Sequence, residues 1–117
     1  MTMQKTLDEL GLRVQRGDPR TPVGMITLDS REVKPGALFA ALPGTRVHGA
    51  EFIQFALRMQ ASAVLTDREG AALAAEELAA HTEVALVVAE DAREALARAA
   101  ALFFAAQPEC TVAVTGT

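Results

Sequence analysis

The sequence predicts an α/β domain in which a mostly parallel sheet has helices packed on its outside. Two patterns predict this class. From residue 25 onward, short apolar runs typical of buried strands alternate with segments whose apolar residues recur at helical spacing. A strand–helix–strand order implies right-handed crossovers, and therefore parallel strands covered by helices. The length of 117 residues is typical of one domain with its own core.

Residues 1–24 are predicted to be a helix and a loop of the same domain. The helix covers residues 5–10, with leucines on one face, and ends at Gly11. The Gly-Asp-Pro sequence at 17–19 is typical of a loop.

Residues 25–117 are predicted to contain five strands and three helices. A Pro-Gly turn at 35–36 separates the first two strands, and Asp91 is expected to cap the last helix, which ends at Pro108. The inner stripe of that helix is expected to be Leu96, Ala99, Ala100 and Phe103. The strands are expected at 25–28, 37–42, 63–66, 84–88 and 111–114, and the other helices at 50–59 and 69–80.

The composition excludes nucleic acid as a partner. The net charge is −4 and the pI is near 5.1, so no basic field attracts a phosphate backbone. Trp and Tyr are absent and only five Phe are present, which leaves little to stack on unpaired bases.

No metal site or membrane segment is expected either. The single cysteine, Cys110, is interpreted as a structural thiol beside a buried strand, and neither His48 nor His81 has metal-ligand spacing around it. His81 is expected at a solvated helix end. The start is not a signal peptide, and the most apolar run, 99–106, is too short to span a membrane. These features favour a reducing, cytoplasmic setting.

The residues alone predict no catalytic group, and they leave open whether two polar loops bind a ligand. No acid–base pair or nucleophile setting can be argued from the spacing, whereas two polar loops, 29–32 and 43–49, each follow a strand. Ligands of open α/β sheets gather at the carboxyl ends of strands, and Gly44 and Gly49 would let the backbone approach one closely. The alternative is that both loops are ordinary connections.

The sequence ends in Thr115, Gly116 and Thr117, directly after the last predicted strand. A glycine loop after a strand is how phosphate-binding loops begin, but the following Gly-Lys-Ser/Thr is absent. We therefore interpret the chain as truncated.

Several of these stretches together resemble the N-terminal domain of the Mur ligases, most closely the MurE type. The order and spacing match from about Ile26 to the end, although His48-Gly49 stands where the family usually has Asp-Gly, Ala37 replaces an Asp, and Gln60-Ala61 replaces a Gly-Ala. The matching stretches are Leu-Asp-Ser-Arg at 28–31, Val-Lys-Pro-Gly at 33–36, Leu-Phe-Ala-Ala-Leu-Pro-Gly at 38–44, Gly-Ala-Glu-Phe-Ile at 49–53, Asp-Ala-Arg-Glu-Ala-Leu at 91–96 and Val-Ala-Val-Thr-Gly-Thr at 112–117.

The resemblance implies that residues 25–117 bind the uridine and diphosphate of UDP-N-acetylmuramoyl-L-Ala-D-Glu. It implies that Leu28 and Ser30 border the uridine pocket, that Thr45, Arg46 and Val47 form its second wall, and that Thr115, Gly116 and Thr117 begin the family's ATP loop. The parent enzyme would be an ATP- and Mg²⁺-dependent ligase of the EC 6.3.2 type, in peptidoglycan synthesis. Its central ATPase and C-terminal domains would be partners in the same polypeptide, and this chain alone would be inactive and hold no cofactor.

Two other functions stay open at this point. One is the N-terminal domain of a MurF-type ligase, which shares the Asp-Ser/Thr-Arg and Pro-Gly elements. The other is an α/β interaction module without a ligand. The sequence also leaves open whether the parent adds meso-diaminopimelate or lysine.

Overall fold

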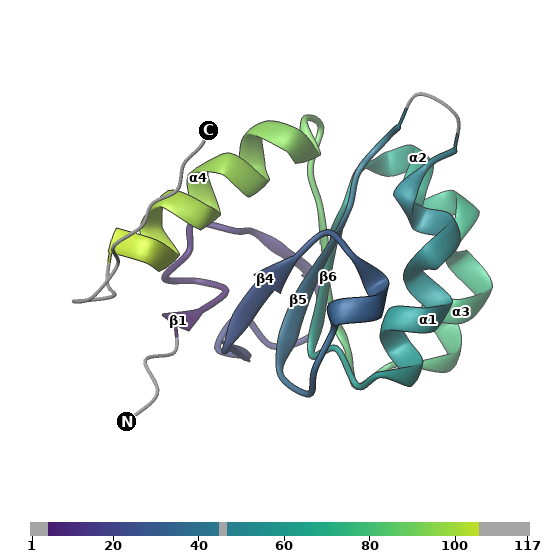
Figure 1. Ribbon diagram of the computed structural model, residues 1–117, viewed down its shortest axis with the longest axis horizontal. Helices are drawn as coiled ribbons and strands as arrows, with labels where there is room; N and C mark the ends of the chain where they lie inside the picture. The colour runs from purple at the N-terminus through teal and green to yellow at the C-terminus, as the bar shows by residue number, and fades with distance from the viewer. Residues whose placement is uncertain (1–4, 45–46, 106–117) are drawn as a thin grey trace.

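The structure is a computed structural model in which residues 5–44 and 47–105 are described. Its centre is a five-stranded sheet with the strand order β2-β7-β6-β5-β4, in which β2 (Val14–Arg16) lies at one edge. Figure 1 shows β4, β5 and β6 side by side. Four neighbouring strands are parallel: β4 (Met25–Thr27), β5 (Ala37–Ala41), β6 (Ala63–Thr66) and β7 (Ala85–Val88). The fold class is thus confirmed as α/β with a mostly parallel sheet.

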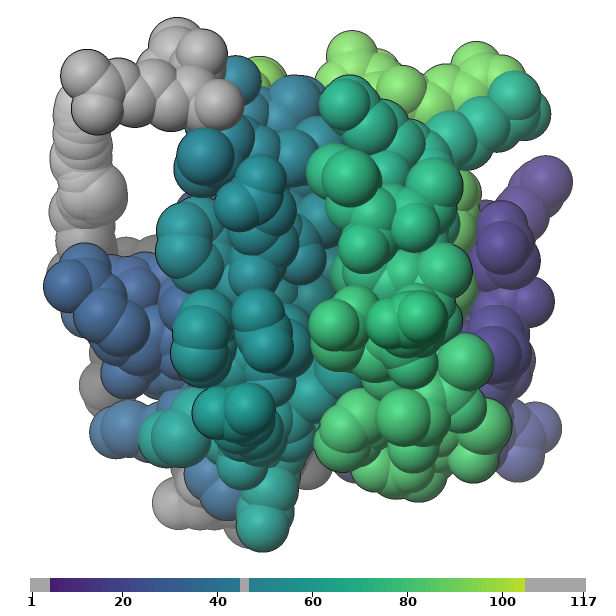
Figure 2. All heavy atoms as spheres, turned by 90° about the vertical axis from the view of Figure 1, so that its right-hand side faces the viewer, coloured from purple at the N-terminus to yellow at the C-terminus, as the bar shows by residue number. Residues whose placement is uncertain are grey.

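Helices cover both faces of the sheet. Figures 1 and 2 show α1 (Ile53–Arg58), α2 (Arg68–Leu73) and α3 (Ala75–Ala80) side by side on one face. On the other face lie α4 (Ala92–Ala105) and residues 5–12 (Figure 1). Two short 3₁₀ turns precede α1 in the chain: η1 (Ser30–Glu32) after β4, and η2 (Gly49–Phe52) directly before α1.

The core has two layers because successive side chains of a strand point to opposite faces. Phe39 and Val64 belong to the layer under α1–α3, whereas Leu38 and Leu65 belong to the layer under α4. All five residues of β5 are buried. This explains why the strand is apolar throughout instead of alternating.

Most of the predicted elements after residue 25 are confirmed within one or two residues, while the helix predicted at 50–59 starts as the 3₁₀ turn η2 and becomes α-helical only at Ile53. One exception is the helix predicted at 69–80, which is divided at Ala74 into α2 and α3. Ala74 leaves helical geometry, with φ −106° and ψ 21°, while its side chain is buried in the core. No glycine or proline marks this break in the sequence, so periodicity alone predicted one helix.

The helix predicted at 5–10 is wrong. Residues 5 and 6 form strand β1 (Lys5–Thr6), which pairs with β3 (Pro22–Val23), and only a single turn follows. The Glu9 carboxylate accepts from the Thr6 N–H at 2.9 Å and the Thr6 hydroxyl accepts from the Glu9 N–H, as in a capping box. Gly11, at φ +75°, then closes the turn as a helix C-cap does, so the turn is capped at both ends and does not extend.

Strand β2 (Val14–Arg16) was not predicted. It pairs antiparallel with β7 at the edge of the sheet. Val14 and Arg16 are half-buried and Gln15 is exposed. Three half-exposed residues do not produce a recognisable period. The predicted strand at 111–114 and Cys110 lie outside the described residues.

Within the part of the chain that the structure describes, none of the helices combines the length and apolar character that a membrane crossing needs.

Candidate functional site

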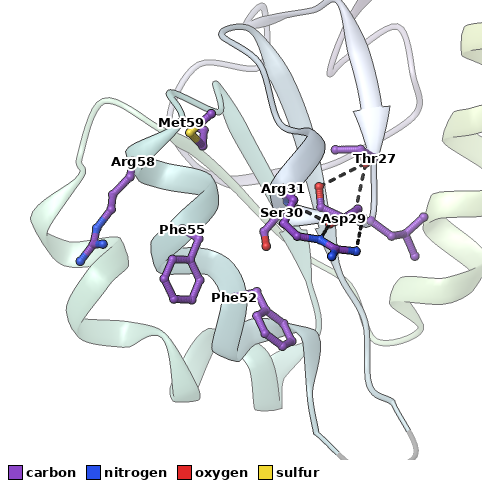
Figure 3. Close-up of a pocket in the computed structure, with 9 residues that line it drawn as sticks. Thr27, Asp29, Ser30, Arg31, Phe52, Phe55, Arg58 and Met59 are labelled. Carbon is purple, nitrogen blue, oxygen red and sulfur yellow. Dashed lines mark hydrogen bonds and ion pairs between the residues drawn. The ribbon is translucent and has the colours of Figure 1, made fainter.

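Two adjoining hollows lie where β4 and β5 end. The first groove, of ≈ 990 Å³, runs between the turn after β4 and the η2–α1 segment (Figure 3). The second groove, of ≈ 640 Å³, lies beside the loop after β5. Leu28 and Phe52 line both. The first is also lined by Thr27, Asp29, Ser30, Arg31, Phe55, Arg58 and Met59, and the second by Ala40, Leu42, Pro43, Gly44, Val47, Gly49 and Arg93.

One wall of the first groove is a turn that the side chains of residues 27–31 hold in shape. The Thr27 hydroxyl accepts from the Asp29 N–H at 3.1 Å, and the Asp29 carboxylate caps η1 by accepting from the Arg31 N–H at 2.9 Å. The Arg31 guanidinium donates to both oxygens of the same carboxylate at 3.0 Å. These hydrogen bonds hold the pKa of Asp29 below its usual range and raise the pKa of Arg31.

Ser30 is the residue of this turn that remains available to a ligand. Among the described residues its hydroxyl makes no hydrogen bond, and Figure 3 shows it on the side of the turn that faces α1. Since its neighbours Asp29 and Arg31 bond to each other, the turn presents one hydroxyl in a fixed backbone frame.

The opposite wall is apolar and exposed. Phe52, Phe55 and Met59 are 41%, 43% and 47% exposed, and Leu28 across from them is 57% exposed. The Arg58 guanidinium lies 5.7 Å from the centre of the Phe55 ring. A contiguous apolar surface of this kind marks a binding site for a ligand or a partner, because a soluble domain otherwise buries such side chains.

The loop after β5 closes on itself at the second groove. The Gly49 N–H donates to the Leu42 carbonyl at 2.7 Å, and the Gly44 N–H donates to the Val47 carbonyl at 3.1 Å. A Cβ on Gly49 would lie 2.8 Å from the Leu42 nitrogen, and one on Gly44 would lie 2.6 Å from the Val47 oxygen. The close approach that these glycines permit is therefore to the chain's own backbone, not to a ligand as the sequence suggested. Val47, 43% exposed, points outward from this closed loop.

Arg93 is a groove residue that the sequence analysis missed. It lies in the first turn of α4, and its Nη2 donates to the Pro43 carbonyl at 2.8 Å. Its position in the sequence could have indicated this. Arg93 follows β7 by a few residues, and the carboxyl ends of parallel strands meet at one edge of the sheet.

His48 ties the same loop to the helical layer. Its Nδ1 accepts from the Ala50 N–H at 2.9 Å, which caps η2, and its Nε2 lies 2.8 Å from Asp67 Oδ1. That carboxylate also accepts from the Gly70 N–H at 2.8 Å and caps α2. Burial acts to raise the pKa of Asp67, but the hydrogen bonds from Gly70 and His48 outweigh it and hold this pKa below the usual range.

The ring of His48 is fully engaged by these contacts. Ligand atoms of His48, Asp67 and Glu69 lie within 4.8 Å of one another, as in a cation site. However, the Ala50 N–H occupies the Nδ1 lone pair, so the neutral ring carries its proton on Nε2 and donates it to Asp67. The imidazole is a structural link between the loop and α2.

The structure brings together only part of the predicted site. Leu28 and Ser30 share the first groove, and Leu28 and Val47 share the second. Thr45 and Arg46, and the predicted start of an ATP loop at Thr115, Gly116 and Thr117, lie outside the described residues. His81 lies at the end of α3 with its side chain 36% exposed, as predicted.

Comparison with protein families matches residues 22–104 to the Mur ligase family, catalytic domain. Curated relatives carry the name UDP-N-acetylmuramoyl-L-alanyl-D-glutamate–2,6-diaminopimelate ligase. The chain is 44% identical to the Caulobacter vibrioides protein over 115 residues, which is 98% of this chain and 22% of the relative. It is 45% identical to the Rhizobium meliloti protein over 103 residues, 87% of the chain and 20% of the relative. The chain thus spans about a fifth of the length of these relatives.

Solved structures show the same fold. A crystal structure of MurF from Acinetobacter baumannii superposes with a TM-score of 0.66 at 23% identity, over 86% of this chain and 21% of that one. A second crystal structure of that protein gives a TM-score of 0.63 at 22% identity, over 83% of this chain and 20% of that one. At such identities the likeness concerns the fold alone.

Proposed function

Since the chain belongs to the Mur ligase family, we propose that it is the substrate-binding domain of a MurE-type ligase and holds the uridine diphosphate end of UDP-N-acetylmuramoyl-L-alanyl-D-glutamate. The observation that carries this proposal is the pair of grooves at the ends of β4 and β5, which share Leu28 as a wall. The names of the curated relatives support a MurE-type parent over a MurF-type one, and diaminopimelate as the amino acid that it adds.

The first groove offers what a uracil ring needs. The ring has two flat faces that gain from apolar contact, and an edge of donors and acceptors. Phe52 and Phe55 supply apolar surface, and Ser30 with the backbone of residues 28–31 supplies hydrogen-bonding groups on the facing wall (Figure 3). A polar turn opposite an apolar helix face therefore orients a flat heterocycle between them.

The predicted residues keep their roles within this proposal. Leu28 and Ser30 border the uridine, and Thr45, Arg46 and Val47 form the second wall, where Arg46 meets the diphosphate. The parent enzyme would transfer the γ-phosphoryl group of ATP to the substrate carboxylate with release of ADP, and an amine would then attack the acyl phosphate and expel phosphate; Mg²⁺ would balance the phosphate charge. Thr115, Gly116 and Thr117 would begin its ATP loop, the other catalytic groups would belong to the central and C-terminal domains, and the enzyme would work in the cytoplasm.

The test is a titration of UDP-N-acetylmuramoyl-L-alanyl-D-glutamate into isotope-labelled protein, followed by NMR. We expect amide shifts at residues 28–31 and 44–49. Ser30→Ala removes one neutral hydrogen bond, about 1 kcal/mol, and should weaken binding less than Arg46→Ala, which removes a charged partner worth about 1.5–3 kcal/mol.

Ser62→Ala is the matched control. Ser62 precedes β6, so it lies at the opposite edge of the sheet, where its hydroxyl donates to the carbonyls of Pro22 and Ala37. This variant should bind like the wild type. If millimolar substrate moves no resonance, or shifts cluster away from both grooves, the proposal fails and an interaction module without a ligand becomes the better explanation.

A further inference from the structure

The second groove contains a cation that no predicted role accounts for. Arg93 enters it from α4, although the other residues that line it come from the segments around β4 and β5. One of its nitrogens, Nη2, donates to the Pro43 carbonyl at 2.8 Å. This hydrogen bond, which is exposed, places the guanidinium beside Pro43, which also lines the groove.

Among the residues that the structure describes, Arg93 uses little of its hydrogen-bonding capacity. A guanidinium has five N–H groups in a planar fork, and the Pro43 carbonyl takes one of them. Among the described residues, no carboxylate lies within ion-pair distance of Arg93, whereas Arg31 pairs with Asp29 and Arg98 pairs with Glu94. A positioned arginine without an acidic partner is suited to bind an anion, because the fork matches two oxygens of a phosphate group.

The other residues of this groove favour a phosphate over a base. Arg93 is the one charged side chain among the described residues that line it, whereas Phe55 and Met59, the aromatic and thioether side chains that suit a flat ring, line the first groove alone. Leu28 and Phe52 line both grooves, so a ligand that lies across them can place its base in the first and its phosphates in the second.

We propose that Arg93 is a diphosphate-binding residue, and that a uridine nucleotide lies across the two grooves with its base against Ser30 and Phe55 and its phosphates against Arg93. This inference rests on the proposed function and assigns a direction to the ligand within it. Arg93 has two tasks in this arrangement: it holds the loop after β5 through Pro43, and it donates its remaining N–H groups to phosphate oxygens.

The test compares uridine with UDP on the 117-residue chain by calorimetry or NMR titration. Arg93→Ala should weaken UDP about tenfold or more, the usual effect of losing a hydrogen bond to a charged group, and should change uridine affinity by less than about twofold. Arg93→Gln keeps an N–H₂ group but no charge, and should show the same selective loss. The salt dependence of UDP binding should also become weaker in both variants.

Arg98→Ala is the matched control, since Arg98 lies on the same helix and pairs with Glu94 at 3.6 Å. It should bind both ligands like the wild type. If Arg93→Ala weakens uridine and UDP equally, Arg93 acts only by holding Pro43 and the inference is wrong. It is also wrong if UDP binding is unchanged in Arg93→Ala. If the wild-type chain binds neither ligand, the proposed function itself fails, and this inference with it.

Discussion

The contact between His48 and Asp67 predicts a large loss of stability in His48→Ala. The His48 side chain is 5% exposed and bridges two helical segments: it accepts from the Ala50 N–H and donates to the carboxylate that caps α2. Truncation to alanine removes both hydrogen bonds. It leaves the Ala50 N–H, which is buried, without an acceptor.

The magnitude follows from these two losses. Removal of an N-cap acceptor costs about 1 kcal/mol, and loss of a hydrogen bond to a charged group costs about 1.5–3 kcal/mol. Since these effects share one side chain and are not additive, we expect the free energy of unfolding to fall by about 2–4 kcal/mol. That is a large part of the roughly 5–15 kcal/mol available to a small domain.

Urea unfolding followed by far-UV circular dichroism measures this change. With an m value of about 2 kcal/mol/M, the midpoint should fall by about 1–2 M. His48→Asn separates the two contacts, because its short amide can still cap η2 but cannot reach Asp67, and it should recover about 1 kcal/mol. His81→Ala is the control: that ring is partly exposed and lies 3.4 Å from Glu83, so the midpoint should not move. A loss below about 1 kcal/mol in His48→Ala, or equal midpoints in the two alanine variants, would refute the reasoning.

Two further predictions concern side chains that connect separate elements of the fold. The pKa of Asp67 is lowered in the fold, so its carboxylate contributes stability above its unfolded pKa of 3.8, and this contribution is lost as the pH falls through the lower folded pKa. The difference in unfolding free energy between wild type and Asp67→Asn should therefore shrink toward acid pH, and a difference independent of pH would contradict this. The Arg16 guanidinium donates to the carbonyls of Leu78, His81 and Val84 at 2.7–3.0 Å, at and beyond the end of α3. Arg16→Ala should cost about 2–4 kcal/mol in the same urea assay, whereas Arg13→Ala, at an exposed position, should cost almost nothing; equal costs would show that these contacts contribute little.

Buried apolar runs made the parallel strands predictable. The segment around β5 is apolar at every position because both of its faces are covered, and its short length between two Pro-Gly pairs favours a strand over a buried helix. The N-terminal elements could not be predicted in the same way. Strand β2 is defined by its pairing with β7, a contact between distant parts of the sequence, and its own residues are only half-buried.

The residues of the candidate site were likewise only partly predictable from the sequence. Leu28 and Ser30 were predicted because they follow a recognisable strand and match a family motif. Arg93 and Asp67 were not, because their roles depend on the side-by-side placement of β5, β6 and β7. His48 lies in the polar loop 43–49 that the sequence analysis singled out, but no local pattern indicates that its partner lies 19 positions away.

The make-up of the two core layers affects the order in which the protein can fold as it is synthesised. The core layer under α1–α3 is built from residues between Val33 and Leu86. The other layer combines Leu7, Leu10 and Leu12 from the beginning of the chain with Ala99 and Phe103 from α4. On the ribosome, these leucines can meet Leu38 and Leu65 before α4 exists, but their layer is complete only when Ala99 and Phe103 have emerged. The part of the sheet that α4 covers therefore stays exposed until late in the synthesis of the domain, and it is the part that a chaperone or a protease would encounter.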